Sequence, residues 1–260
     1  MKKNSGNKRW IKGVVGNVLY PIIALGLLFA LWAIVAAAYK KPLVLPMPDA
    51  VVSRFFSLFA EEYFWNAVLS SLLRTFISFV VSFFAAYLFA FAAAKAEPLG
   101  KILDTVVAVL RAAPTVAVIL IAYAFMSSRT MSVVVGFLIA FPILYSNFLT
   151  ALRGVDNNLI TMAKIYKVKK SSVLINVYFL NVLPSVFDVC RATSSLTLKV
   201  VIAAEILTSV SKSVGGAIKN ANSTFEIDYL LAWTCMAIVL SFLLESTVSL
   251  LKKLCVRWTR

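Results

Sequence analysis

One polar segment divides the apolar sequence of this chain. Residues 153–184 read RGVDNNLITMAKIYKVKKSSVLINVYFLNVLP. Residues 153–172 are mostly polar or basic, and a stretch of that composition does not cross a bilayer. Apolar blocks long enough to span a membrane lie on both sides of the segment. The segment therefore predicts a polar connection at one surface of a membrane protein.

A short amphipathic helix is predicted at the front of this segment, over residues 156–170. Apolar residues recur there at i, i+3, i+4 and i+7, a spacing that places them on one helix face. These residues are Leu159, Met162, Ala163 and Tyr166. Asp156 stands just ahead of them, where its carboxylate is suited to cap the helix. Basic side chains occupy much of the remaining surface, namely Lys164, Lys167, Lys169 and Lys170. A helix of this kind is typical of an element that docks a soluble partner.

The composition of the whole chain indicates an all-α integral membrane protein. The chain has 260 residues, of which 61% are hydrophobic and 14% are charged. Soluble domains average about half apolar and about a quarter charged residues. Membrane β-barrels are built from alternating segments of about ten residues, whereas the apolar runs here are continuous and much longer. Helices satisfy every backbone amide within their own segment, so they are the expected spanning structure.

The apolar runs predict six transmembrane helices within one transmembrane domain, residues 1–260. The predicted spans cover about residues 14–39, 67–93, 102–126, 131–152, 185–208 and 229–251. Pro114 and Pro142 lie inside the third and fourth spans, and the fifth begins just after Pro184. A short amphipathic helix at the membrane surface is also predicted, from Asp49 onward.

The basic residues predict the orientation in the membrane. The formal net charge is +15, and most Lys and Arg residues outside the spans fall on the side that holds both termini. Because cytoplasmic loops carry the excess of Lys and Arg, both termini and residues 153–172 are predicted to be cytoplasmic. No soluble basic domain accompanies this charge, so nucleic-acid binding is not expected.

The sequence offers no cofactor or metal site and little for catalysis. It contains no histidine, which removes imidazole ligands and imidazole bases. The cysteines Cys190, Cys235 and Cys255 have no paired or metal-like spacing. A membrane enzyme stays open as an alternative, but the candidate carboxylates are scattered along the chain. They are Asp104, Asp188, Glu205 and Glu245.

Charged residues inside the predicted spans admit two interpretations. They pair with one another to hold helices together, or they face a translocation path and attract an anionic solute. Their depths place Arg74 near Glu205, and they place Asp188 and Glu245 where either could neutralise Arg111. The candidates for the path are Arg74, Arg111, Pro114, Asn147, Arg191 and Glu205.

Residues 153–184 resemble the cytoplasmic "EAA" loop of permease subunits of bacterial ABC importers. That loop reads E-A-A-x-x-x-G, with L-P some seventeen residues after the glycine. Alignment on Leu183 and Pro184 puts Thr161 at the glutamate position and Lys167 at the glycine position, with Met162 and Ala163 following Thr161. Because glycine permits a sharp turn, Lys167 predicts a straighter helix or a turn placed elsewhere.

Further motifs resemble the nitrate/sulfonate/taurine class of these permeases, which also includes transporters of thiamine and riboflavin precursors. The similar stretches are LPMP at 45–48, LRAAPTVAV at 110–118, FPILYSN at 141–147 and CRATSSLTLKVVIAAEIL at 190–207. Leu73 and Arg74 also fit, and Arg191 and Glu205 fall on matching positions of the last motif. The similarity covers about residues 43–252 in matching order.

The resemblance implies a multi-pass permease of the bacterial inner membrane, surrounded by lipid. Two permease copies would form the path, two cytoplasmic ABC ATPases would drive it, and an extracytoplasmic binding protein would deliver a small solute. Residues 153–172 would be the coupling segment, contacting the ATPase through Leu159, Met162, Ala163, Lys164, Tyr166 and Lys167. The chain has no Walker motif, so it is expected not to be an enzyme itself. A secondary transporter or channel without an ATPase is the main alternative. The sequence does not choose among an oxyanion, a sulfonate and a vitamin precursor.

Overall fold

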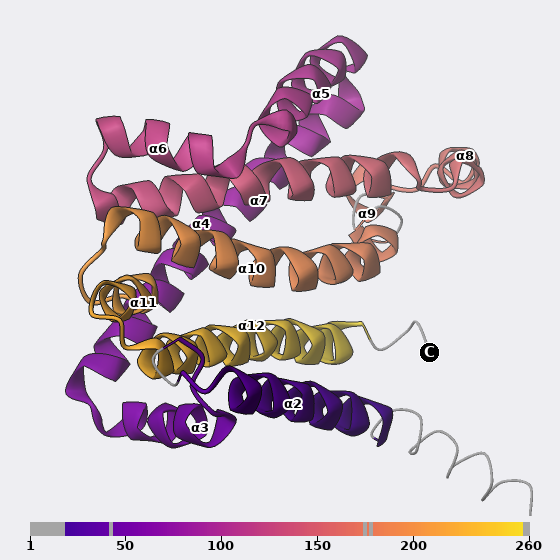
Figure 1. Ribbon diagram of the computed structural model, residues 1–260. Coiled ribbons are helices and arrows are strands. Elements are labelled where there is room, and N and C mark those ends of the chain that lie inside the picture. Colours follow the sequence, from indigo (N-terminus) through magenta and orange to yellow (C-terminus); the bar gives the residue numbers. More distant parts are fainter. Residues whose placement is uncertain (1–18, 42–43, 174–175, 177–178, 257–260) are drawn as a thin grey trace, which may run out of the picture.

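The described part of the chain is built from helices, as its composition predicts (Figure 1). The computed structural model describes residues 19–41, 44–173, 176 and 179–256. Residues 14–18 of the predicted first span, the basic residues before them and residues 257–260 lie outside this part.

The helices follow one another closely along the chain. In order they are α2 (Tyr20–Tyr39), α3 (Pro48–Ser57), the short 3₁₀ helix η2 (Leu58–Ala60), α4 (Glu62–Lys95), α5 (Glu97–Ala112), α6 (Thr115–Phe125), α7 (Ser128–Arg153), α8 (Asn157–Ile165), α9 (Lys170–Val173), α10 (Leu180–Thr208), α11 (Val214–Ser223) and α12 (Ile227–Cys255). Helix α3 is the short amphipathic helix predicted from Asp49 onward.

Each predicted span coincides with helical structure, but the spans differ in composition. Among the described residues, α2, α4, α7 and α12 are long and apolar enough to cross a membrane, and the pair α5 and α6 qualifies when taken together. Helix α10 has 29 residues, yet Asp188, Arg191, Lys199 and Glu205 make it more polar. It also begins four residues before Pro184, which lies inside the helix and not ahead of it as the sequence indicated.

The predicted third span, 102–126, is two helices instead of one. Helices α5 and α6 meet at an angle of 96°. Ala113 between them has the extended conformation, φ −67° and ψ 128°, because the ring of Pro114 disfavours helical geometry in the residue before it. The break leaves α6 only 11 residues long.

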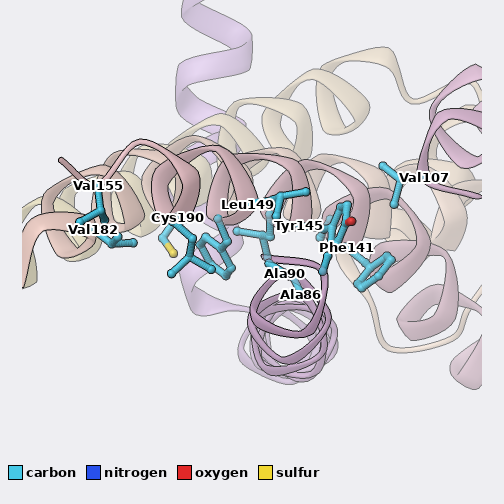
Figure 2. Close-up of a cluster of buried hydrophobic side chains, with 14 residues drawn as sticks. Ala86, Ala90, Val107, Phe141, Tyr145, Leu149, Val155, Val182 and Cys190 are labelled. Carbon is cyan, nitrogen blue, oxygen red and sulfur yellow. The ribbon is translucent and has the colours of Figure 1, made fainter. Parts of the chain in front are cut away.

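One large cluster of buried apolar side chains lies where α4 and α10 pack on α7 (Figure 2), and a second joins α4 and α10 to α11 and α12. Small side chains of α4, such as Ala86 and Ala90, let the helix backbones approach closely. Gly136 of α7 marks a close approach of these helices, since a Cβ atom there would lie 2.7 Å from Ser78 Oγ and 3.0 Å from Val201 Cγ2.

The elongated helices give the protein two distinct ends (Figure 1). Helices α7, α10 and α12 run in alternating directions, so α8 and the last turn of α12 lie at one end, while α3 and α11 lie at the other. We refer to these as the α8 end and the α11 end.

Candidate functional site

Helix α8 presents apolar side chains away from the body of the protein. Asp156 caps it as the sequence predicts, because its Oδ1 accepts a hydrogen bond of 2.8 Å from the backbone N–H of Asn158. Leu159, Met162 and Tyr166 are 41%, 53% and 75% exposed. Three of the four predicted apolar contact residues therefore lie open at the α8 end.

The fourth predicted residue, Ala163, does not share this exposure. It is partly buried, one turn after Ile160, which packs on the core. Ile165, which does not follow the apolar spacing of the other residues, has a side chain that is 71% exposed. We call the exposed apolar surface formed by Leu159, Met162, Ile165 and Tyr166 the α8 face.

The chain turns sharply after α8, and the turn is centred on Lys167. The expectation of a straighter helix or a displaced turn is wrong, because Lys167 adopts the left-handed conformation, with φ 51°. The N–H of Val168 donates to the carbonyl oxygen of Ala163 at 2.9 Å, which closes the helix as in a Schellman motif. A lysine in this conformation costs about 1–2 kcal/mol relative to ordinary helical geometry. The turn thus lies at the glycine position of the "EAA" pattern even though the glycine is missing.

The basic residues of α8 lie around its apolar surface. Lys164 and Lys167 are exposed, and neither forms an ion pair with a residue in the described ranges. Their ammonium groups are available to acidic groups of another protein.

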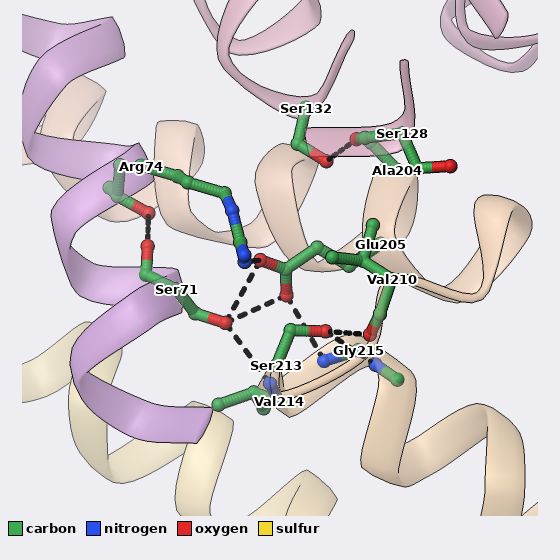
Figure 3. A network of polar contacts seen from close by, with 12 residues as sticks. Ser71, Arg74, Ser128, Ser132, Ala204, Glu205, Val210, Ser213, Val214 and Gly215 are labelled. Atoms are coloured by element: carbon green, nitrogen blue, oxygen red, sulfur yellow. Dashed lines mark hydrogen bonds and ion pairs between the residues drawn. The ribbon is translucent and has the colours of Figure 1, made fainter. Parts of the chain in front are cut away.

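A buried polar network joins α4, α10 and α11 near the α11 end (Figure 3). The predicted pair of Arg74 and Glu205 is present, with Nη1 and Oε1 2.6 Å apart. Ser71 donates to the Glu205 carboxylate, at 2.8 Å to Oε2, and the N–H of Gly215 reaches the same oxygen at 3.1 Å. Glu205 is fully buried, and the Arg74 side chain is only 12% exposed. The network thereby satisfies a buried carboxylate with one cation and several donors.

The start of α11 is shaped to fit this carboxylate. Ser213 caps the helix by accepting a hydrogen bond of 2.8 Å from the N–H of Gly216. A Cβ atom on Gly215 would lie 2.4 Å from the Cβ of Glu205, so a larger residue does not fit without displacing the backbone. No sequence motif pointed to Gly215 and Gly216, because their role depends on how closely α11 packs on α10.

The remaining path candidates are more exposed. Arg111, at the end of α5, donates a hydrogen bond of 3.1 Å to the carbonyl oxygen of Pro142 and makes no ion pair with a described carboxylate. The suggested neutralisation of Arg111 by Asp188 or Glu245 is therefore wrong. Pro114 is exposed at the start of α6. Asn147 is exposed on α7 and donates to the carbonyl oxygen of Ile143 in its own helix.

Helices α10 and α12 carry ion pairs on a shared face near the α8 end. Asp188 binds Lys252 with a separation of 2.6 Å, and Arg191 lies 3.7 Å from Glu245. A hollow of about 850 Å³ opens beside these pairs and is lined mainly by Asp188, Arg191, Ser249, Lys252 and Lys253. Among the described residues, no group of three or more His, Cys, Asp or Glu side chains is placed to hold a metal ion.

Comparison with known proteins identifies similar sequences over most of the chain. The chain is 26% identical over 234 residues to a putative aliphatic sulfonates transport permease protein, SsuC, of Escherichia coli, covering 88% of each chain. It is 24% identical to the taurine transport system permease protein TauC of the same organism, covering 99% of this chain and 96% of the relative. It is also 24% identical to the nitrate import permease protein NrtB of Synechococcus elongatus, over 76% of this chain and 75% of that one.

Solved structures share the fold. A chain of a bacterial ABC transporter involved in the import of the acidic polysaccharide alginate matches with a TM-score of 0.66 and 14% identity, covering 97% of this chain and all of that one. An amino acid ABC transporter matches with a TM-score of 0.61 and 11% identity, over 74% of this chain and 93% of that one.

A family profile matches residues 84–255, which is well over half of the chain and includes α8, the charged face of α10 and Glu205 of the polar network, whose other members Ser71 and Arg74 lie before the matched range. The description of that family is "Binding-protein-dependent transport system inner membrane component". This chain belongs to that family of ABC importer permease subunits.

Proposed function

We propose that two copies of this chain form the translocation path of an ATP-driven importer and that α8 couples the path to cytoplasmic ATPases. As a member of its family the chain is a multi-pass transport subunit of the inner membrane and not an enzyme. ATP hydrolysis belongs to a separate ATPase subunit, and a binding protein delivers the small solute. The observation that carries the proposal is the exposed α8 face at one end of the long helices.

The α8 face has the properties of a docking surface. Its four large apolar side chains form one exposed patch, which is typical of a protein interaction site. The turn at Lys167 fixes the end of the helix. Lys164 and Lys167 flank the apolar residues and supply the complementary charge for acidic groups on an ATPase. Leu159, Met162 and Tyr166 form the centre of this contact, with Ile165 added, while Ala163 supports the helix from within.

Both termini and the α8 end lie in the cytoplasm in this proposal. The excess of Lys and Arg on that side supports the orientation. Six crossings result if α5 and α6 together make one bent crossing and α10 makes another. The α11 end then faces the binding protein.

Among the path candidates, we assign roles by exposure. Arg111, Asn147 and Arg191 are exposed and are proposed to line the path, together with the bend at Pro114. Arg74 and Glu205 are enclosed within one protomer, so we propose that they hold α11 against α4 and α10. Leu196 and Lys199 of α10 are exposed within one protomer, which supports a second copy of the chain on that side.

Reconstituted uptake tests the proposal against a secondary transporter. Proteoliposomes containing the chain with its ATPase are loaded with ATP and offered taurine, ethanesulfonate, nitrate or thiamine together with the binding protein. We expect uptake of at least one probe that requires both ATP and the binding protein. Accumulation driven by an ion gradient in liposomes without the ATPase would support the alternative function instead.

A further inference from the structure

We infer that Lys199 of α10 binds the negatively charged group of the transported solute, so that this residue selects anions within the path. The inference rests on the proposed function, in which two protomers enclose a path beside α10. It concerns a residue that lies within the motif at 190–207 but was given no role there.

Lys199 lies on a side of α10 that is exposed in the described part of the chain. Asp188, Arg191, Leu196 and Lys199 are all exposed, and their spacing places them along one side of the helix. The neighbouring residues Leu198 and Val200 are buried against other helices, Leu198 fully and Val200 to 8% exposure. The protein thus leaves this one side of α10 open while covering the others.

Lys199 lies too deep in the helix to reach a membrane surface easily. It is nine residues before Thr208, which places it about 14 Å from the α11 end of α10, and about 28 Å from the other end. Side chains on a helix lean toward its N-terminus, which for α10 is the α8 end. The ammonium group therefore leans away from the nearer polar surface and toward the middle of the membrane.

No described residue compensates the charge of Lys199. It makes no ion pair or hydrogen bond with the described residues. The carboxylates on α10 and α12 that approach its depth are already engaged, Glu205 with Arg74 and Glu245 with Arg191. An uncompensated cation at this depth is costly against lipid tails, so the residue must face water or a bound anion.

The surroundings favour an anion. The hollow at the α8 end of the same face is lined by Arg191, Lys252, Lys253 and Asp188, and Glu245 lies 3.7 Å from Arg191, so three cations stand against two carboxylates. The α8 end of this face therefore keeps a net positive charge, because Lys253 makes no ion pair with a described carboxylate. A solute with a negative group gains electrostatic stabilisation at Lys199 and is then attracted onward.

The test measures whether this face of α10 is accessible to water and whether Lys199 makes it favour anionic over cationic reagents. Leu196→Cys, on the same side of α10 and three residues before Lys199, is introduced after replacing the three native cysteines. The permease–ATPase complex in nanodiscs is treated with an anionic reagent, sulfonatoethyl methanethiosulfonate, or a cationic one, trimethylammonioethyl methanethiosulfonate. Phe76→Cys on α4, 64% exposed and at mid-depth, is the matched position expected to face lipid.

We expect both reagents to modify Leu196→Cys and neither to modify Phe76→Cys at a comparable rate. The ratio of anionic to cationic modification rates should fall on the order of tenfold when Lys199→Gln is added, and it should be retained with Lys199→Arg. Uptake of an anionic probe should fall with Lys199→Gln and recover with Lys199→Arg. Yield of the intact complex checks that each variant assembles.

Two results overturn the inference. If Leu196→Cys resists both reagents as Phe76→Cys does, lipid or protein covers this face. If the rate ratio is unchanged by Lys199→Gln, the residue does not select charge. If the complex still shows ATP-dependent uptake, either result contradicts the role of Lys199 but not the proposed function. Absence of ATP-dependent uptake with the unmodified chain would contradict the proposed function itself.

Discussion

Replacing Glu205 with alanine is expected to destabilise the protein by about 3–5 kcal/mol. The change leaves the guanidinium of Arg74 in a buried site without its counter-charge. It also removes the acceptor for Ser71 and for the N–H of Gly215 at the start of α11. Breaking one partner of a buried ion pair is costly because the remaining charge has been taken out of water. Thermal unfolding of the purified protein and its yield in the membrane measure the effect.

The matched control is Glu97→Ala, which breaks an exposed pair with Lys101 and should change stability little. The double variant with Arg74→Met and Glu205→Met tests the cause, because removing both charges should recover part of the stability lost by Glu205→Ala. If Glu205→Ala unfolds at the same temperature as Glu97→Ala, the buried network does not hold α11 in place.

Replacing Met162 with aspartate is expected to abolish association with the ATPase while leaving the permease folded. Met162 is 53% exposed and lies within the α8 face, so a charge there is hydrated in the free protein but desolvated in the complex. Loss of a central apolar contact typically costs at least about 2 kcal/mol, or roughly thirtyfold in affinity. Co-purification of the ATPase with the tagged permease measures the loss.

Met47→Asp is the control for this substitution. Met47 is 41% exposed and precedes α3 at the opposite end of the protein, where an aspartate is well suited to cap the helix. Its complex should retain the ATPase. Equal retention by Met162→Asp and Met47→Asp would contradict docking through the α8 face.

Features that depend on local pattern could be predicted from the sequence. The apolar runs located the long helices, and Asp156 was recognised as a cap because capping needs only a suitable side chain just before the helix. Helix depth alone placed Arg74 near Glu205, since each residue advances the helix by a fixed rise. These inferences required no knowledge of how the helices pack.

Features that depend on packing or on backbone geometry could not be predicted from the sequence. Ala163 follows the apolar spacing as well as Leu159 does, but contact with the body of the protein turns it inward and leaves Ile165 outside. Pro114 predicts a break without predicting its angle of 96°. Lys167 occupies a conformation that lysine disfavours, and hydrogen bonds of the helix end compensate for the cost.

Photo-crosslinking at Tyr166 tests the central claim that α8 contacts the ATPase. Tyr166 at the α8 end and Phe225 at the α11 end are 75% and 77% exposed, so each can be replaced by benzoylphenylalanine with little effect on folding. The complex is irradiated in native membranes, and the adducts are identified by mass spectrometry. We predict an adduct with the ATPase from position 166 and none from position 225. An ATPase adduct from position 225 alone, or from neither position in a complex that hydrolyses ATP, would contradict the account.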